Sequence, residues 1–311
     1  MILKANDPTK KHEKIQMIFK ANDPTKKHDA LILFDCKNGN PNGDPNADNM
    51  PRQDMMTNLS YITDVATKYK LRMAMEELSK DIEDAHRYNR LIKKDAVINK
   101  AIEQGYLDTG IKPDKKKKTQ QESMVLEHLI DKYFDLRFFG GVLSTGTNKA
   151  GTYDGPMQVT FAQSYDPVRV EQIAITRCAV ASEKENKENK TMGRKAFLHY
   201  GLYSAKIFFS PHRDKFNLIT EDDMELFWTA TQKMFEFDRS AARGDMALRG
   251  LFIFTHAHKY GDVPAHKLYE AIEVNKVSES EPNNYSDYSV NINEAKLADF
   301  YAEGGILTKY V

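Results

Sequence analysis

A short apolar segment that runs into a long turn-forming loop is the feature that most constrains the fold of this chain. Residues 31–34 have the composition of a buried strand. Residues 35–52 are then rich in Asn, Gly, Asp and Pro, which adopt left-handed backbone conformations or form turns between side chain and backbone. A rigid strand that ends in such a loop is typical of a binding site, because the strand positions the loop and the loop supplies polar contacts.

Helical and strand patterns alternate along the rest of the chain. Residues 59–78 carry apolar residues at helical spacing, residues 80–135 are charged and favour helix, and residues 221–237 form another helix pattern. Strand patterns bounded by Gly, Pro and Asp occupy residues 138–143, 157–164, 173–180 and 251–254. We therefore predict an α+β fold with a ferredoxin-like, RRM-like core.

Two segments are expected to interrupt this core. The helix-favouring residues at about 80–135 predict an inserted helical subdomain. Residues 181–196 are rich in Glu, Lys and Asn and lie between strand patterns, which predicts a projecting β-hairpin over about 178–203. From the residues alone, a disordered surface loop is the main alternative for this second segment.

The N-terminal segment is an almost exact tandem duplication. Residues 1–12 recur at residues 17–28, with a single difference at Leu3 and Phe19. The unit is too short to form a solenoid repeat and does not occur a third time. We expect residues 1–28 to be peripheral to function and residues 29–311 to form the folded core.

Composition restricts the function classes without selecting one. The 311 residues, 41% of them apolar, suffice for a sizeable core in one large domain or two small ones. Lys and Arg number 45 against 45 Asp and Glu, so any nucleic-acid groove must be a local basic stripe. No apolar run of membrane-spanning length or signal-peptide pattern is visible, so we expect a cytoplasmic protein without membrane contact. Cys36 and Cys178 have no metal-binding or redox spacing.

Several segments together resemble a known family. They are residues 35–52, Thr63-Asp64-Val65, residues 139–148, residues 155–161, residues 191–203, and residues 238–246 followed by residues 264–268. In this order they resemble the backbone subunit of type I CRISPR Cascade effector complexes, a member of the RAMP superfamily, most closely the type I-C form. The resemblance implies a non-catalytic subunit without cofactor or metal that binds guide RNA and stacks head-to-tail on copies of itself. The expected partners also include the target DNA strand, other Cascade subunits and a recruited helicase-nuclease.

Candidate RNA contacts in the first half of the chain follow from residue types and from this resemblance. The loop after the first strand offers Lys37, Asn38, Asn40, Asn42 and Arg52. The helix pattern that follows places Lys68, Lys70 and Arg72 on or near its polar face. A solvated surface is the simpler interpretation of these three cations, whereas the resemblance places them beside guide phosphates.

The second half adds three further groups of candidates. Ser144, Thr145 and Asn148 lie among glycines and can position a sugar–phosphate chain. No Gly-Lys-Ser/Thr ending follows them, so nucleotide hydrolysis is not supported. The resemblance makes the hairpin a thumb, with Met192 as a wedge between bases and with Arg194 and Lys195 on adjacent phosphates. Arg239 and Arg243 can bind phosphates, with pairing to Asp238 and Asp245 as an equal alternative.

Two catalytic readings remain as alternatives. In type III relatives of the superfamily a loop aspartate cuts target RNA. Asp44, Asp48 and Asp54 are the candidates for that role in this chain. His256 and His258 have a spacing that metal ligands use, but a His pair at a strand end is more often hydrogen-bonded structure. A metal-dependent hydrolase is therefore the least favoured reading.

Overall fold

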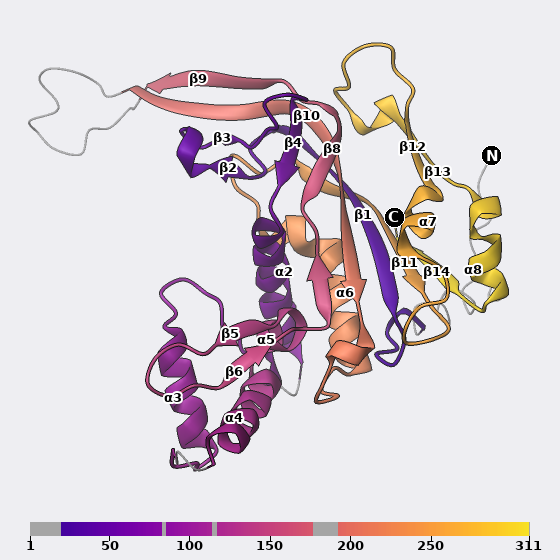
Figure 1. Cartoon of the computed structure of the whole chain (residues 1–311). Helices are drawn as coiled ribbons and strands as arrows, with labels where there is room; N and C mark the ends of the chain where they lie inside the picture. The colour runs from indigo at the N-terminus through magenta and orange to yellow at the C-terminus, as the bar shows by residue number, and fades with distance from the viewer. Residues whose placement is uncertain (1–19, 83–84, 114–116, 177–191, 311) are drawn as a thin grey trace, which may run out of the picture.

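An antiparallel β-sheet forms the centre of the protein. The computed structural model describes residues 20–82, 85–113, 117–176 and 192–310. The largest sheet has eight strands, and its main path has the order β14-β11-β1-β10-β8-β4, with β7 and β9 also paired to β10 (Figure 1). The strands are β1 (His28–Gly39), β4 (Leu59–Ile62), β7 (Met157–Val159), β8 (Ala162–Pro167), β9 (Val170–Thr176), β10 (Met192–Phe209), β11 (Met246–Thr255) and β14 (Ile306–Tyr310). The predicted mixture of helices with a sheet is thus confirmed at this level.

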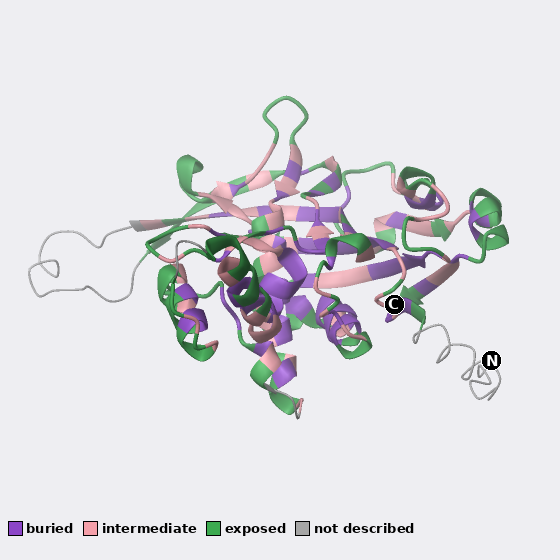
Figure 2. Cartoon of the chain, turned by 60° about the horizontal axis from the view of Figure 1, so that its bottom comes forward, coloured by how far each residue is buried: buried purple, intermediate pink, exposed green. Residues whose placement is uncertain are grey.

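Strand β1 is buried on both faces of the sheet. Ile32 and Phe34 belong to the core formed with α2 (Asp64–Leu78) and α6 (Glu221–Phe237). Leu31 and Leu33 belong to a second core. The elements over that side are α7 (Ala265–Glu270), β12 (Ile272–Lys276), β13 (Tyr288–Ile292) and α8 (Ala298–Ala302). Burial on both sides explains why residues 31–34 are uniformly apolar, and Figure 2 shows buried positions concentrated in this layered region.

A separate helical subdomain lies below the sheet in Figure 1 and occupies much of the predicted insertion. It comprises α3 (Ile98–Asp108), α4 (Lys118–Lys132) and the hairpin of β5 (Gly141–Leu143) and β6 (Gly151–Tyr153). Ile102, Tyr106, Val125, Leu129 and Tyr153 build a core of its own. Two 3-10 turns, η2 (Ser79–Asp81) and η3 (Ala85–Tyr88), lead into it, and α5 (Phe134–Phe139) leads back to the sheet.

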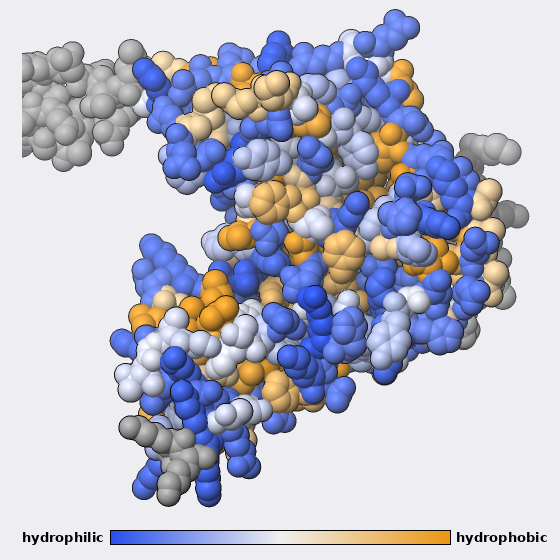
Figure 3. All heavy atoms as spheres, viewed as in Figure 1, coloured by the Kyte–Doolittle hydropathy of each residue, from blue (hydrophilic) through white to orange (hydrophobic). Residues whose placement is uncertain are grey.

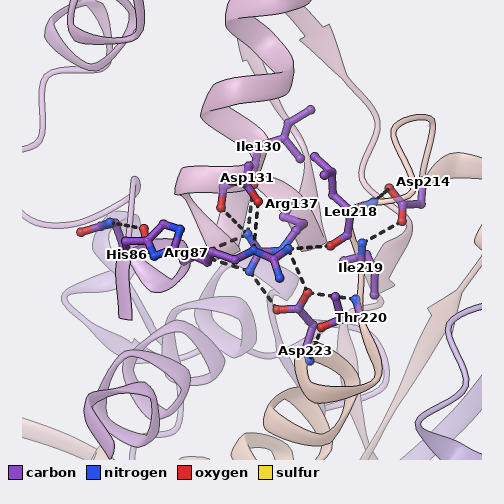
Figure 4. Close-up of polar contacts among 11 residues, drawn as sticks. His86, Arg87, Ile130, Asp131, Arg137, Asp214, Leu218, Ile219, Thr220 and Asp223 are labelled. Atoms are coloured by element: carbon purple, nitrogen blue, oxygen red, sulfur yellow. Dashed lines mark hydrogen bonds and ion pairs between the residues drawn. The ribbon is translucent and has the colours of Figure 1, made fainter. Parts of the chain in front are cut away.

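A fully buried ion pair joins the helical subdomain to α6 (Figure 4). Arg137 on α5 donates to Asp223 Oδ1 at 2.8 Å, and neither side chain is exposed. The same guanidinium donates to the carbonyl oxygens of Asp131, Ile130 and Arg87. Asp223 also closes the capping box at the start of α6. One arginine therefore donates hydrogen bonds to carbonyl oxygens at the end of α4 and in the η3 turn, and to the carboxylate at the beginning of α6.

The second copy of the N-terminal repeat is partly folded into the core. Ala21 and His28 have no exposed surface. The indole Nε1 of Trp228 donates to the Ala21 carbonyl at 2.9 Å, and β1 begins at His28. Residues 20–28 thus contact the core, although the expected boundary lies after residue 28. Residues 1–19 lie outside the described residues.

His28 makes the stability of this region depend on pH. Its Nε2–H donates to the Asp23 carbonyl at 2.7 Å, so Nδ1 accepts from Thr255 Oγ1 at 3.0 Å and the ring is neutral. Burial lowers the pKa of His28 from 6.5 to about 4. Because the folded-state pKa is depressed, this stabilisation is present above pH 6.5 and is lost as the pH falls toward 4. The loss should reach about 3 kcal/mol.

Urea unfolding at several pH values between 7 and 4 tests this expectation. His28→Gln should flatten the pH dependence of the unfolding free energy relative to the wild type in this window. His212→Gln, at an exposed position, is the matched control and should keep the wild-type dependence. Parallel curves for wild type and His28→Gln would show that His28 is not the titrating group.

Candidate nucleic-acid interface

The asparagine-rich loop after β1 is held in shape by its own polar groups. Asn40 Nδ2 donates to the Asn49 carbonyl at 2.7 Å. Asn42 Oδ1 accepts from the backbone N–H of Thr63 at 3.0 Å and from its hydroxyl at 3.1 Å, which ties the loop to the start of α2. A Cβ at Gly43 would lie 2.0 Å from Asn49 Oδ1, so any larger residue there would require the Asn49 side chain to move. The loop contains the short elements β2 (Gly43–Asp44), η1 (Pro45–Ala47) and β3 (Met50–Pro51).

The arginine-containing loop after α6 packs directly on this first loop. The Ala242 carbonyl accepts from the backbone N–H of Asn40 at 2.7 Å, and the Asp245 carbonyl accepts from that of Lys37 at 2.9 Å. A Cβ at Gly39 would lie 2.7 Å from the Ala242 oxygen, so the approach requires glycine. Two of the predicted candidate segments, far apart in sequence, therefore meet at the end of β1.

Most of the predicted RNA-contacting cations have an acidic partner within the chain. Of nine candidate Lys and Arg residues, six form ion pairs. The pairs are Arg52–Asp44 at 3.3 Å, Lys68–Asp64 at 3.1 Å, Arg72–Asp135 at 3.0 Å, Arg243–Asp238 at 2.9 Å, Lys70–Asp238 and Arg239–Glu236. Each pair lowers the positive charge presented to a phosphate. The binding roles of these six residues stay predictions.

Asp238, which the sequence suggested only as a partner of the loop arginines, forms two ion pairs. It pairs with both Lys70 on α2 and Arg243 in the loop. Lys70 is only 4% exposed, and its burial lowers the pKa of the ammonium group. Lys70 therefore fixes α2 to the end of α6, a role that its place on a predicted polar helix face did not indicate.

The candidate thumb begins as a two-stranded ribbon of β9 and the first part of β10, here called the arm. Met192 pairs with Thr176, Arg194 with Ala174 and Lys195 with Ile173. Neighbouring residues on a strand point to opposite faces, so Arg194 and Lys195 lie on opposite faces of the arm. Arg194 is exposed and has no acidic partner among the described residues. Lys195 Nζ donates to the Ala241 carbonyl at 3.3 Å.

Part of the predicted thumb lies outside the residues that the structure describes. Residues 177–191, which connect the two strands of the arm, are not described. The backbone of Met192 belongs to β10, whereas its side chain is not described, so its wedge role stays a prediction. Gln172 of the arm donates to Asp48 Oδ2 at 3.2 Å and links the arm to the asparagine-rich loop.

A hollow separates the arm from the helical subdomain. Figure 3 shows it between the region of β2, β3 and the arm and the face formed by α3 and β5. Ser144, Thr145 and Asn148 lie on the helical side, where Thr145 Oγ1 donates to Asn99 Oδ1 at 2.7 Å. Asn148 lines a pocket of about 320 Å³ with Tyr106, Lys118 and Lys149. These three residues are therefore not part of the cluster at the end of β1.

Lys37 and Asn38 lie at the root of the arm. Lys37 Nζ donates to Asn284 Oδ1 at 2.6 Å. Asn38 has a positive φ of 49° and an exposed side chain. Both residues line a polar surface pocket of about 420 Å³ together with Arg169 and His199.

The three aspartates of the alternative nuclease reading all take part in local structure. Asp44 accepts from the Asn46 backbone N–H at 3.0 Å and pairs with Arg52. Asp48 accepts from Gln172. Asp54 accepts from the backbone N–H groups of Met56 and Thr57, which hold the pKa of its carboxyl below the usual range. Each of the three therefore has a polar partner within the described residues.

His256 is committed to buried structure. Its Nε2 contacts Asp29 Oδ2 at 2.8 Å, and its Nδ1 accepts from the Asp262 backbone N–H at 2.9 Å. His258 is exposed and contacts Asp262 Oδ1 at 2.6 Å. Within the part of the chain that the structure describes, no group of three or more His, Cys, Asp or Glu side chains is arranged to hold a metal ion.

The sequence matches a protein-family model over most of its length. The model is described as CRISPR-associated protein Cas7 and matches residues 26–293. The chain is therefore a CRISPR-associated protein, and it belongs to the Cas7 family. No curated protein matches the sequence. Among the described residues, no helix combines the length and apolar character that crossing a membrane requires.

Solved structures with some likeness to the chain come from RNA-guided complexes. One is a chain of a CRISPR RNA-guided surveillance complex in a pre-nicking state, with a TM-score of 0.44, 12% identity, and coverage of 73% of this chain and 78% of that chain. Another surveillance-complex chain has a TM-score of 0.37, 12% identity, and coverage of 73% and 68%. A chain of the type III-B Cmr-beta complex bound to cognate target RNA has a TM-score of 0.38, 10% identity, and coverage of 81% and 68%. All three likenesses are remote.

Proposed function

We propose that this Cas7-family protein is the guide-RNA-binding backbone subunit of a type I CRISPR effector complex, of the I-C form. Family membership supports a role in an RNA-guided complex. The observation that carries the proposal is the meeting of three candidate segments at the end of β1. Residues 38–52, the loop after α6 and the root of the arm contact one another there. They stand at the upper edge of the hollow in Figure 3.

The strand order supports an RRM-like palm. Along the chain, β1 is followed by α2, β8, β10, α6 and β11, and in the sheet these strands lie in the order β11-β1-β10-β8. Two strand–helix–strand units that interleave in this way form the ferredoxin-like arrangement. The arm then corresponds to the thumb of the family.

The guide would be held mainly through its phosphates and riboses. Arg194 on the exposed arm supplies a charge without an acidic partner among the described residues, and backbone groups of the asparagine-rich loop supply further donors. Such contacts carry no base information, so one subunit accepts any spacer sequence. Met192 at the outer part of the arm is the candidate wedge between base pairs.

Copies would add to one another by a heterologous contact that does not close, giving a helical filament along the guide. The filament would present guide bases to one strand of target DNA, so base pairing reads the sequence. Other effector subunits and a recruited helicase-nuclease would complete the complex. In this proposal the subunit itself does not cut, and the local hydrogen bonds of Asp44, Asp48 and Asp54 support their structural role.

Arg194→Ala should weaken guide-RNA binding equally for unrelated spacer sequences. Loss of one phosphate contact should reduce the slope of log K against log salt by about 1. Fluorescence anisotropy with two guides of different sequence, at several salt concentrations, measures both quantities. Arg213→Ala, at an exposed arginine in the 3-10 turn η4 (Pro211–Arg213), which follows the end of β10 opposite the arm, is the matched control and should bind as the wild type does. Spacer-dependent losses would contradict phosphate contact by Arg194.

A further inference from the structure

A pair of parallel aromatic rings, one half-buried and one exposed, lies at the edge of the sheet, where β4 and β8 run side by side (Figure 1). The rings of Tyr61 and Phe161 have centroids 6.3 Å apart and planes within 8° of each other. Phe161 is 55% exposed. Ile62 follows Tyr61 in β4, and Ala162 follows Phe161 at the first position of β8; both are buried in the core with α2 and α6. Because side chains alternate along a strand, Tyr61 is turned away from that core, and the exposure of Phe161, which directly precedes β8, shows that its ring also faces away from it.

Hydrogen bonds hold the backbone of both residues in place. The Tyr61 N–H donates to the Arg52 carbonyl at 3.1 Å. The Thr160 hydroxyl donates to the Phe161 carbonyl at 3.0 Å and accepts from the Lys206 N–H at 3.0 Å. An aromatic ring has few rotatable bonds, so a ring on a fixed strand loses little conformational entropy when it binds a ligand.

We infer that Tyr61 and Phe161 form a stacking platform for an unpaired base of a single-stranded nucleic acid. Every nucleobase has a π-face, so a flat aromatic surface accepts any base without reading its sequence. Residues 59–62 and 157–165, which carry the platform, contain no carboxylate that would repel a phosphate. Nucleic acid is favoured over a protein partner because the Arg52 contact joins the platform directly to the asparagine-rich loop. The choice of ligand therefore rests on the proposed function.

A tryptophan placed at the platform gives a direct test. The chain has one tryptophan, Trp228, and it is 1% exposed, so its own emission serves as a constant background. Phe161→Trp should show emission quenched on addition of a single-stranded uridine oligonucleotide, whereas Phe237→Trp, at a 37% exposed position, should not. In anisotropy with the same oligonucleotide, Phe161→Ala should bind about tenfold more weakly. Phe161→Tyr should bind as the wild type does, because it keeps the ring.

The outcomes separate this inference from the proposed function. A wild-type protein that binds neither guide nor oligonucleotide would overturn the proposed function. RNA and DNA oligonucleotides are both tested for quenching, and no quenching of Phe161→Trp by either overturns the platform, whatever the guide affinity. Normal oligonucleotide binding by Phe161→Ala, with intact thermal unfolding, also overturns it. So does loss of self-association in Phe161→Ala without any nucleic acid, because that result would assign the pair to a contact between proteins.

Discussion

Arg137→Ala is expected to lower the free energy of unfolding by about 3–5 kcal/mol. The substitution leaves the Asp223 carboxylate fully buried without its ionic partner from α5. It also frees the carbonyl oxygens of Ile130 and Asp131, which Arg137 now satisfies at the end of α4. Urea unfolding followed by Trp228 fluorescence reports the loss, because Trp228 lies on the same helix as Asp223.

Arg239→Ala is the matched control for this arginine. Arg239 also forms an ion pair, with Glu236, but its side chain is 60% exposed. Removal of such a surface pair should change stability by less than about 1 kcal/mol. Equal effects of the two substitutions would show that the buried joint does not hold the helical subdomain to α6.

Asp238→Ala is expected to destabilise the fold by about 3 kcal/mol. The substitution leaves the Lys70 ammonium group, which is 4% exposed, without a carboxylate partner. Burial already lowers the pKa of Lys70, and the hydrogen bond that Lys70 donates to Asp238 is the main effect that opposes this shift. Arg243 loses the same partner. The loop after α6, which packs on the asparagine-rich loop, should therefore become less rigid as well. The free energy of unfolding in urea and the affinity for guide RNA should both decrease.

A double-mutant cycle separates the charge effect from simple loss of packing. In a Lys70→Met background no buried ammonium group is left without a partner. Asp238→Ala should therefore lower the free energy of unfolding clearly less than it does in the wild type. A cycle of Lys80 and Glu77, an exposed pair near the end of α2, is the control and should show little coupling. Strictly additive losses at Lys70 and Asp238 would contradict the assigned role of this pair.

Local patterns predicted the elements that bury apolar faces. The uniform apolar run at residues 31–34 belongs to β1. The helical spacing over residues 59–78 corresponds to α2 from Asp64 onward, whereas residues 59–62, predicted as helix, form strand β4. The turn chemistry of residues 38–49 also follows from sequence, since Asn38, Asp48 and Asn49 have positive φ. These signals depend on neighbouring residues alone, and β1, α2 and the positive φ values agree with them.

The ion pairs were outside the reach of local patterns. Lys70 and Asp238 are 168 positions apart, and only the packing of α2 on α6 brings them together. The register of the arm was missed for a different reason. Residues 192–196 belong to β10, but an exposed two-stranded ribbon has little burial and therefore a weak alternating pattern, so the sequence placed them in a polar excursion. Arg194 and Lys195 were therefore both predicted to contact adjacent phosphates, whereas in the structure they lie on opposite faces of the arm.

The most direct test of the account is to co-express the chain with a processed CRISPR guide RNA and purify the product. Its mass and the length of RNA protected from nuclease are measured, and complementary RNA and DNA are added in a cleavage assay. The account predicts multimers in which each added copy protects a constant length of guide, with no cleavage of either strand. A monomer that ignores RNA would contradict it. Regularly spaced cuts in target RNA, abolished by Asp44→Ala, Asp48→Ala or Asp54→Ala, would instead establish the nuclease reading.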